Sequence, residues 1–138
     1  MKLQKIVDRL QKLHPKEIDL SLDRTKNLLE KLGNPQDQIN CISITGTNGK
    51  YSTIKAIYAI LKEAGYKCNI YTSPHIQKIN ERFVYNNKSL TNDELAKLLS
   101  EIEEANNGSQ ITFFEILTVA YFYYARKYPK NINLIESG

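Results

Sequence analysis

Residues Ile42 to Thr53 decide the fold of this chain, and they read Ile-Ser-Ile-Thr-Gly-Thr-Asn-Gly-Lys-Tyr-Ser-Thr. An apolar run leads into a loop with two glycines, and a lysine and hydroxyl residues follow. Beyond the loop, apolar side chains recur with the spacing of one helix face, at Ile54, Ile57, Tyr58 and Leu61. Strand, glycine loop and helix in this order predict a phosphate-binding loop, because the glycines let backbone N–H groups converge on an anion and the helix N-terminus adds partial positive charge.

The polar residues of this loop have places in such a site. Lys50 would reach the outer phosphates of a nucleotide, and Ser52 or Thr53 would offer a hydroxyl to a phosphate or to Mg²⁺. The stretch reads G-x-x-G-K-Y-S and so departs from the strict pattern G-x-x-x-x-G-K-S/T at two places. The alternative is an ordinary strand-to-helix turn in which Gly46 and Gly49 supply positive φ. The flanking strand and helix favour phosphate binding, because the motif requires that context.

Length and composition bound the class of protein. At 138 residues, with 41% hydrophobic and 25% charged residues, the chain has the composition of one globular domain. Its formal net charge of +4 suits an anionic ligand such as ATP. No Lys/Arg run or basic–aromatic patch is present, which argues against nucleic acid as a partner.

The sequence also predicts a cytoplasmic protein without a membrane partner. The N-terminus lacks the apolar core of a signal peptide. The most apolar run, Ile111 to Ala125, is too short to span a bilayer and contains Glu115. Cys41 and Cys68 form no C-x-x-C pair, and we expect both to be small buried side chains in a reducing compartment.

Capping and turn signals complete the interpretation as an α/β protein. The expected elements are helices near 3–10 and 23–32, a strand at 41–45, the helix after the loop, a strand at 67–72, a hairpin at 83–90, helices after Thr91-x-x-Glu94 and Thr112-x-x-Glu115, and a last strand at 133–136. Because one helix joins the first two strands, they form a βαβ unit and should be parallel. The helix that begins at Phe113 is apolar nearly all round, so it should be central and buried.

Three polar residues outside the loop are further candidates for ligand contacts. Ser73 follows the carboxyl end of the second strand, where it could reach a metal on the phosphates or form a simple Ser-Pro turn. Arg82 could make a bidentate contact with a carboxylate or phosphate, or a surface salt bridge. Glu136 ends the last strand, and a carboxylate at the tip of a core strand beside a phosphate loop is where a Mg²⁺ ligand belongs.

Four sequence words around the loop occur in the order of one known family. They are Leu28-Leu29-Glu30-Lys31-Leu32-Gly33-Asn34-Pro35-Gln36, Tyr71-Thr72-Ser73-Pro74-His75, Asn80-Glu81-Arg82-Phe83 and Thr112-Phe113-Phe114-Glu115. With them, the loop matches the family's G-T-N-G-K-G-S except at Tyr51. The series resembles the N-terminal part of folylpolyglutamate synthase and dihydrofolate synthase, which belong to the Mur ligase superfamily. The resemblance runs from about Leu20 to Gly138.

The resemblance implies a fold and a division of the chain. The fold is a P-loop-type, mostly parallel sheet flanked by helices, as a truncated part of a Mur-ligase central ATP-binding domain. Residues 1–39 would be a helical lead-in and residues 40–138 the P-loop core of one incomplete domain. The C-terminal ligase domain of the family would be absent.

The resemblance also implies a reaction, in which ATP and Mg²⁺ drive the addition of L-glutamate to a folate or dihydropteroate carboxylate through an acyl phosphate. Lys50 would be the catalytic residue, and Ser73 and Glu136 would hold Mg²⁺. The family's aromatic and acidic residues near the pterin pocket correspond to Phe113, Phe114 and Glu115, which could instead be core residues and a helix cap. The residues that would hold the triphosphate are Gly46, Thr47, Asn48, Gly49, Lys50, Ser52 and Thr53.

Two departures from the family keep other hypotheses open. Tyr51 replaces the glycine after the lysine, and its phenol could crowd the phosphates or point outward. The family also continues well beyond this length, with another metal-binding histidine, a modified lysine and a domain that closes over ATP. The chain could therefore be a catalytically incompetent remnant that at most binds nucleotide. A third hypothesis is a stand-alone P-loop nucleotide-binding module.

Overall fold

The computed structural model describes residues 2–14, 23–45, 49–72 and 78–136. The chain forms two compact units, and each is built from two segments of sequence. Residues 1–37 and 91–126 make the first unit, and residues 38–90 and 127–138 make the second. The division expected from the sequence, with a lead-in at 1–39 and a core at 40–138, stays a prediction.

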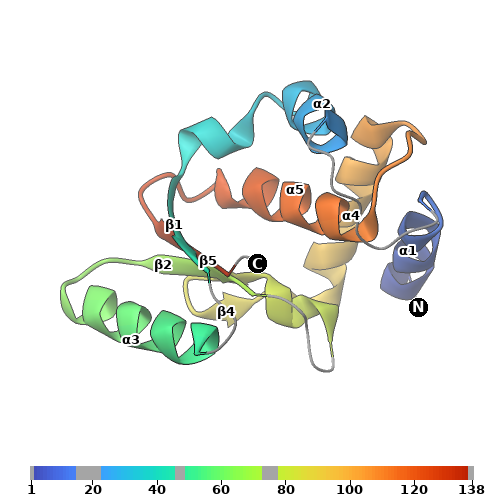
Figure 1. Ribbon diagram of the computed structural model, residues 1–138. Coiled ribbons are helices and arrows are strands. Elements are labelled where there is room, and N and C mark those ends of the chain that lie inside the picture. The colour runs from blue at the N-terminus through green and yellow to red at the C-terminus, as the bar shows by residue number, and fades with distance from the viewer. Residues whose placement is uncertain (1, 15–22, 46–48, 73–77, 137–138) are drawn as a thin grey trace. The chain divides into compact units, whose positions relative to one another are not determined.

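The first unit is helical. Within it, α5 packs against α1, α2 and α4 (Figure 1). Six apolar side chains of α5 are almost completely enclosed, as the nearly uniform apolar character of this segment predicted; they are Ile116, Leu117, Val119, Ala120, Tyr121 and Ala125. The helices of this unit are α1 (Lys2–Gln11), α2 (Asp23–Lys31), α4 (Asn92–Asn106) and α5 (Phe113–Ala125), and a short 3₁₀ helix, η1 (Pro35–Gln38), follows α2.

Two capping boxes begin α4 and α5, and both were predicted. The Thr91 hydroxyl accepts a hydrogen bond from the backbone N–H of Glu94, whose carboxylate accepts one from the Thr91 backbone N–H. Thr112 and Glu115 make the same pair of bonds at the start of α5. Each box satisfies N–H groups that have no partner inside the helix, and so it fixes the first residue of that helix.

The second unit is a five-stranded sheet with α3 (Lys50–Glu63) along one face (Figure 1). The strand order is β1-β5-β2-β3-β4. β1, β5 and β2 are parallel, whereas β3 and β4 are antiparallel, so the α/β class is confirmed and the sheet is mixed, with a parallel part of three strands. The strands are β1 (Asn40–Ile44), β2 (Cys68–Tyr71), β3 (Val84–Tyr85), β4 (Lys88–Ser89) and β5 (Ile132–Glu136), and the 3₁₀ helix η2 (Ile79–Arg82) precedes β3.

The last strand of the chain lies between the two strands of the predicted βαβ unit. β1 and β2 are parallel, as expected, but each pairs with β5. Ile44 is opposite Glu136 in one ladder, and Tyr71 is opposite Ile135 in the other. The carboxyl ends of all three parallel strands therefore meet at one edge of the sheet, which is where open α/β sheets bind ligands.

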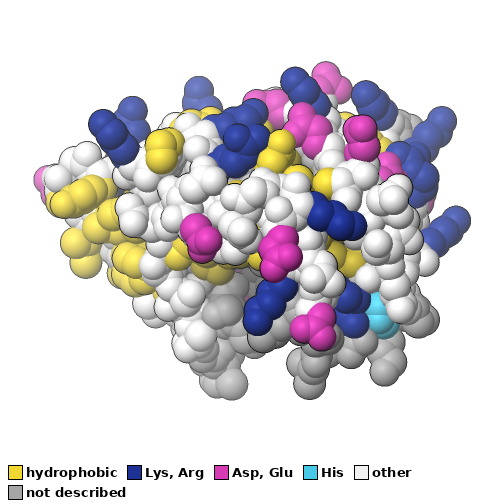
Figure 2. All heavy atoms as spheres, turned by 90° about the horizontal axis from the view of Figure 1, so that it is seen from above, with side chains coloured by type: hydrophobic (Ala, Val, Ile, Leu, Met, Phe, Trp, Pro, Cys, Tyr) yellow, Lys and Arg dark blue, Asp and Glu magenta, His cyan; other side chains and the backbone are white. Residues whose placement is uncertain are grey.

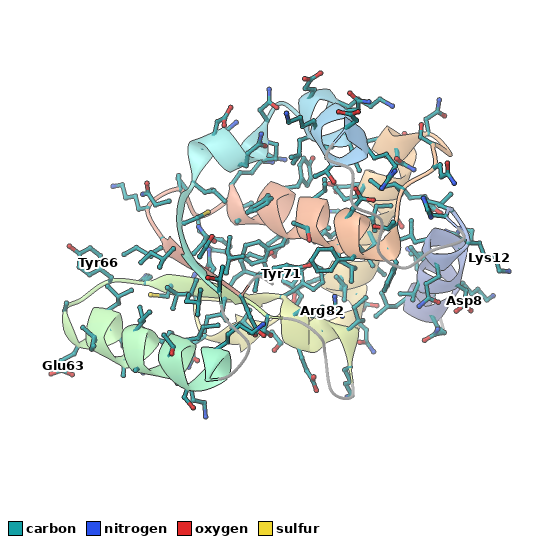
Figure 3. The ribbon with its side chains drawn as sticks, viewed as in Figure 1. Asp8, Lys12, Glu63, Tyr66, Tyr71 and Arg82 are labelled. Atoms are coloured by element: carbon teal, nitrogen blue, oxygen red, sulfur yellow. The ribbon has the colours of Figure 1, made fainter. Side chains whose placement is uncertain are left out.

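Alternation along the strands divides the sheet into two faces. Ile44, Leu134 and Ile54 form a buried core with the apolar stripe of α3, so even-numbered residues of β1, β2 and β5 face that helix. This core confirms the stripe predicted for the helix after the loop. Odd-numbered residues face the other way, and Figure 3 shows Tyr71 on the side of the sheet away from α3.

The face away from α3 carries a buried asparagine network. Asn69 and Asn133 are fully buried, and Asn69 Nδ2 donates to Asn133 Oδ1 over 3.1 Å. Asn133 Nδ2 donates to the Asn40 carbonyl over 3.0 Å, while Asn131 Nδ2 donates to Asn69 Oδ1 over 3.1 Å. These bonds tie β1, β5 and β2 together through side chains as well as backbone, and they satisfy polar groups that burial would otherwise leave costly.

The expectation that both cysteines are buried was wrong for Cys41. Cys68 is buried, whereas Cys41 is exposed, and both thiols are free. The reason is the place of β1, which pairs only with β5 among the described strands and so forms one edge of the sheet. Four of its five residues are exposed, and Ile44 alone is buried.

Charges of both signs are interspersed over the face drawn in Figure 2. Lysine and arginine side chains there alternate with aspartate and glutamate side chains, as on an ordinary solvated surface. Among the described helices, none has the length and apolar character needed to cross a membrane.

Candidate nucleotide-binding site

The sheet brings the start of α3 and the end of β5 together. β1 ends at Ile44, and the segment after it leads into α3, whose first residue is Lys50. Glu136, the last residue of β5, is paired with Ile44. The predicted phosphate loop and the predicted metal-binding carboxylate therefore lie at the carboxyl ends of neighbouring parallel strands.

The pleat of β5 decides which way Glu136 points. Leu134 faces α3, and Glu136 follows it by two residues, so its carboxylate lies on the same face. There Lys50 Nζ lies 3.7 Å from Glu136 Oε1. Both side chains are largely enclosed, with 18% of Lys50 and 13% of Glu136 exposed. The structure thus brings together two residues that were separate candidates in the sequence and lie 86 positions apart.

The N-terminus of α3 is suited to an anion. Gly49 is its N-cap residue, with φ 74° and ψ 8°, and a glycine has no side chain that could cap the helix. The first turn contains no acidic residue, so nothing there opposes the positive end of the helix dipole. The first backbone N–H groups of a helix lack intrahelical acceptors, and a phosphate can supply them.

Several predicted site residues can be placed and others cannot. Lys50, Ser52 and Thr53 lie in the first turn of α3, and both hydroxyl residues are exposed. The predicted residues Gly46, Thr47, Asn48 and Ser73 lie outside the described residues. Within the described ranges, no group of three or more His, Cys, Asp or Glu side chains could hold a metal ion. Glu136 therefore belongs to no such cluster within the part of the chain that the structure describes.

Arg82 lies in the same unit as this site. It ends η2 and is buried, with 9% of the residue exposed. Its neighbour Phe83 is fully buried, and the Phe83 ring packs edge-on against Tyr71, with 6.1 Å between ring centroids. An arginine held in such surroundings, at the end of the segment that follows β2, remains a candidate for anion contact.

The other predicted substrate residues lie in the first unit. Phe113 is half-buried and Phe114 is exposed, at 37%. Glu115 is buried, and four bonds hold its carboxylate: Oε1 accepts from Arg24 Nε at 3.0 Å, from the Thr112 backbone N–H at 3.0 Å and from the Thr112 hydroxyl at 2.8 Å, and Oε2 accepts from the Thr25 hydroxyl at 3.0 Å. Burial raises the pKa of Glu115, but the hydrogen bonds from Thr112, Arg24 and Thr25 outweigh burial and hold the pKa below its ordinary value.

Arg24 and Thr25 did not emerge from the sequence. They lie in the first turn of α2 and belong to no motif, and their contacts with Glu115 span 91 and 90 positions. Of the contacts of Glu115, only the helix cap had a local sequence signal, the spacing of Thr112-x-x-Glu115. The hydrogen bonds from Arg24 and Thr25 of α2 depend on how the chain folds.

No family model matches the chain. Curated proteins of similar sequence do match it. The chain is 34% identical over 124 residues to dihydrofolate synthase/folylpolyglutamate synthase of Bacillus subtilis, which covers 85% of this chain and 29% of that protein. It is 31% identical over 129 residues to the Escherichia coli protein of the same name, covering 94% of this chain and 31% of that protein. The chain thus spans about a third of the length of these relatives.

Solved structures match over the whole described fold. E. coli FolC in complex with DHPP and ADP has a TM-score of 0.87 and 30% identity, covering 99% of this chain and 33% of that one. The Yersinia pestis bifunctional folylpolyglutamate synthase/dihydrofolate synthase, complexed with AMPPNP and Mn ion, has a TM-score of 0.87 and 28% identity, covering 99% and 33%. An FPGS–AMPPCP–folate complex has a TM-score of 0.87 and 29% identity, covering 100% and 35%. In sequence and in fold, the chain corresponds to the N-terminal portion of the folylpolyglutamate synthase and dihydrofolate synthase family, with its Mur-ligase fold.

Proposed function

We propose that the chain binds ATP and Mg²⁺ between the start of α3 and the tip of β5. The observation that carries this proposal is the 3.7 Å contact of Lys50 Nζ with Glu136 Oε1, at a helix N-terminus whose N-cap residue is a glycine. A lysine ammonium, a carboxylate and the first backbone N–H groups of a helix are the parts that a magnesium–nucleotide site needs. The similar proteins solved with ADP, or with AMPPNP and Mn ion, support the same ligands here.

Each residue has a stated part in this proposal. The N–H groups that follow Gly49, with Gly46, Thr47 and Asn48 by resemblance, would hold the phosphates. Lys50 would lie against the outer phosphates as the catalytic cation, and Ser52 and Thr53 would offer hydroxyls. Glu136 would hold Mg²⁺ together with Ser73. When bound, the metal would neutralise charge on the phosphate oxygens, and the chain's own work would be positioning and charge stabilisation.

We further propose that this site serves a ligase of the folate type. The reaction would activate a folate or dihydropteroate carboxylate as an acyl phosphate, which the amine of L-glutamate then attacks. The support is the similarity to synthases whose solved complexes contain DHPP or folate. Arg82, Phe113 and Phe114 are the proposed substrate contacts. Glu115 is better assigned to positioning α2 on α5, because four hydrogen bonds already occupy its carboxylate.

Mass spectrometry of the ligation product tests the function. The 138-residue chain would be incubated with ATP, Mg²⁺, L-glutamate and either dihydropteroate or a folate, beside a Lys50→Ala variant. We expect a product heavier by one glutamyl residue from the native chain and none from the variant. ATP binding without any product would instead support the alternative, a nucleotide-binding chain without ligase activity.

A further inference from the structure

One contact joins residues that the proposed function gives to two different ligands. Lys50 is assigned to the phosphates and Glu136 to the metal, yet Lys50 Nζ lies 3.7 Å from Glu136 Oε1. Within the described chain, neither charge has another ionic partner. A single contact therefore satisfies the cation and the carboxylate of the site together.

Enclosure makes this contact consequential. With only 13% and 18% of the two side chains exposed, water screens their attraction less than it would at an open surface. A cation that binds Glu136 must take the carboxylate from Lys50 and then tolerate a neighbouring ammonium group. A phosphate that binds Lys50 must draw the ammonium away and leave Glu136 without its partner.

We propose that the Lys50–Glu136 ion pair couples the binding of metal and nucleotide, so that each ligand frees the residue that holds the other. Lys50 has a flexible four-carbon stem and can swing from the carboxylate to a phosphate without moving α3. Once it leaves, Glu136 presents an unpaired carboxylate beside the phosphates. Divalent metal and nucleotide then bind far better together than either binds alone. The inference rests on the proposed function. It adds that the affinity for each ligand is higher when the other ligand is bound.

Coupling makes a prediction that a purely structural salt bridge does not. Removal of Lys50 should strengthen the binding of a divalent cation, because the competing ammonium is gone. Removal of the Glu136 charge should strengthen the binding of nucleotide in the absence of metal, because Lys50 no longer has to leave a carboxylate. Each replacement removes the cost of breaking the same ion pair, so the two gains in affinity should be of similar size.

The first arm of the test measures Mn²⁺ alone. Free Mn²⁺ is followed by electron paramagnetic resonance as it is titrated into the nucleotide-free chain. We expect Lys50→Ala to bind Mn²⁺ at least about fivefold more tightly than the native chain, the lower end of ordinary coupling between two sites. The double variant Lys50→Ala/Glu136→Gln should lose that gain. Lys62→Ala removes an exposed lysine from the last turn of the same helix and should change nothing.

The second arm measures nucleotide alone. ATP is titrated calorimetrically into each chain in the presence of EDTA. We expect Glu136→Gln to bind metal-free ATP more tightly than the native chain, by a factor similar to that of the first arm. Glu63→Gln is the matched control, because Glu63 is exposed at the far end of α3, where Figure 3 shows it.

The outcomes separate this inference from the proposed function. Unchanged or weaker Mn²⁺ binding by Lys50→Ala, or unchanged metal-free ATP binding by Glu136→Gln, overturns the coupling. If the coupling fails but ATP·Mg²⁺ binds the native chain and does not bind Lys50→Ala, the proposed function stands without the coupling. If no chain binds ATP with or without metal, both fail.

Discussion

Arg24 donates a hydrogen bond from Nε to Oε1 of Glu115 over 3.0 Å, and the two residues are 91 positions apart in the sequence. The contact ties the first turn of α2 to the first turn of α5 inside the helical unit. The Thr25 hydroxyl, from the same turn of α2, bonds the other carboxylate oxygen at 3.0 Å. Glu115 therefore holds a helix other than its own in place, besides capping the helix that it begins.

Replacing Glu115 by glutamine should destabilise the chain markedly. The amide cannot accept all four hydrogen bonds, and the ion pair with Arg24, whose side chain is only 21% exposed, is lost. We expect a loss of about 3 kcal/mol in the free energy of unfolding, which is typical when one partner of an enclosed pair is removed. Urea unfolding followed by circular dichroism measures this loss. Glu103→Gln breaks the more exposed pair with Arg9 and should cost much less.

The same carboxylate should make stability depend on pH in the acid range. The pKa of Glu115 lies below its ordinary value of 4.5 in the folded chain, so the folded state binds the proton less readily than the unfolded state. The stabilisation is then fully present above the unfolded pKa and is lost as pH falls through the folded pKa. The urea concentration at the unfolding midpoint of the native chain should therefore decrease as the pH falls below about 4.5. For Glu115→Gln, the midpoint should decrease less over the same pH range. Equal slopes for the two chains would contradict this assignment.

The asparagine network should show coupled energetics. Asn133→Ala removes the acceptor of the fully buried Asn69 Nδ2 and the side-chain donor to the Asn40 carbonyl, at a cost of about 1–3 kcal/mol. Asn69→Ala should cost a similar amount. The double variant should cost less than the sum of the two, because the shared bond is lost only once, and urea unfolding of all four chains gives that difference. Strict additivity would show that the two side chains act independently.

Gly49 should tolerate asparagine better than alanine. Its φ of 74° disfavours side chains with a Cβ, although among the described residues nothing lies within 4 Å of where that Cβ would be. The cost of Gly49→Ala should therefore be backbone strain alone, about 1–2 kcal/mol. Asparagine adopts this conformation more readily, so Gly49→Asn should lose less stability. Thermal unfolding of the three chains ranks them, and a larger loss for asparagine than for alanine would argue that the strain explanation is wrong.

Local signals in the sequence predicted local structure well. Thr91 and Thr112 with their glutamates predicted two helix starts, and paired asparagines predicted a hairpin, in which Asn86 and Asn87 have φ of 52° and 65°. These signals succeed because neighbouring residues settle the outcome. The roles expected of Lys50 and Glu136 in nucleotide and metal binding stay predictions.

Long-range pairing could not be predicted in the same way. Nothing in residues 132–136 says that β5 enters between β1 and β2, because parallel ladders carry no local turn signal. The exposure of Cys41 follows from the edge position of β1, and the Arg24–Glu115 contact follows from the packing of α2 on α5. Each depends on segments far apart in sequence.

The central claim is that Lys50 and Glu136 belong to one magnesium–nucleotide site. Calorimetric titration of ATP·Mg²⁺ into the purified chain tests it most directly, beside Lys50→Ala and the control Lys62→Ala, with circular dichroism to show that all three are folded. We predict saturable heat from the native chain and from Lys62→Ala, and none from Lys50→Ala. The claim would be contradicted by a folded native chain that gives no heat, or by a Lys50→Ala chain that binds as tightly as the native one.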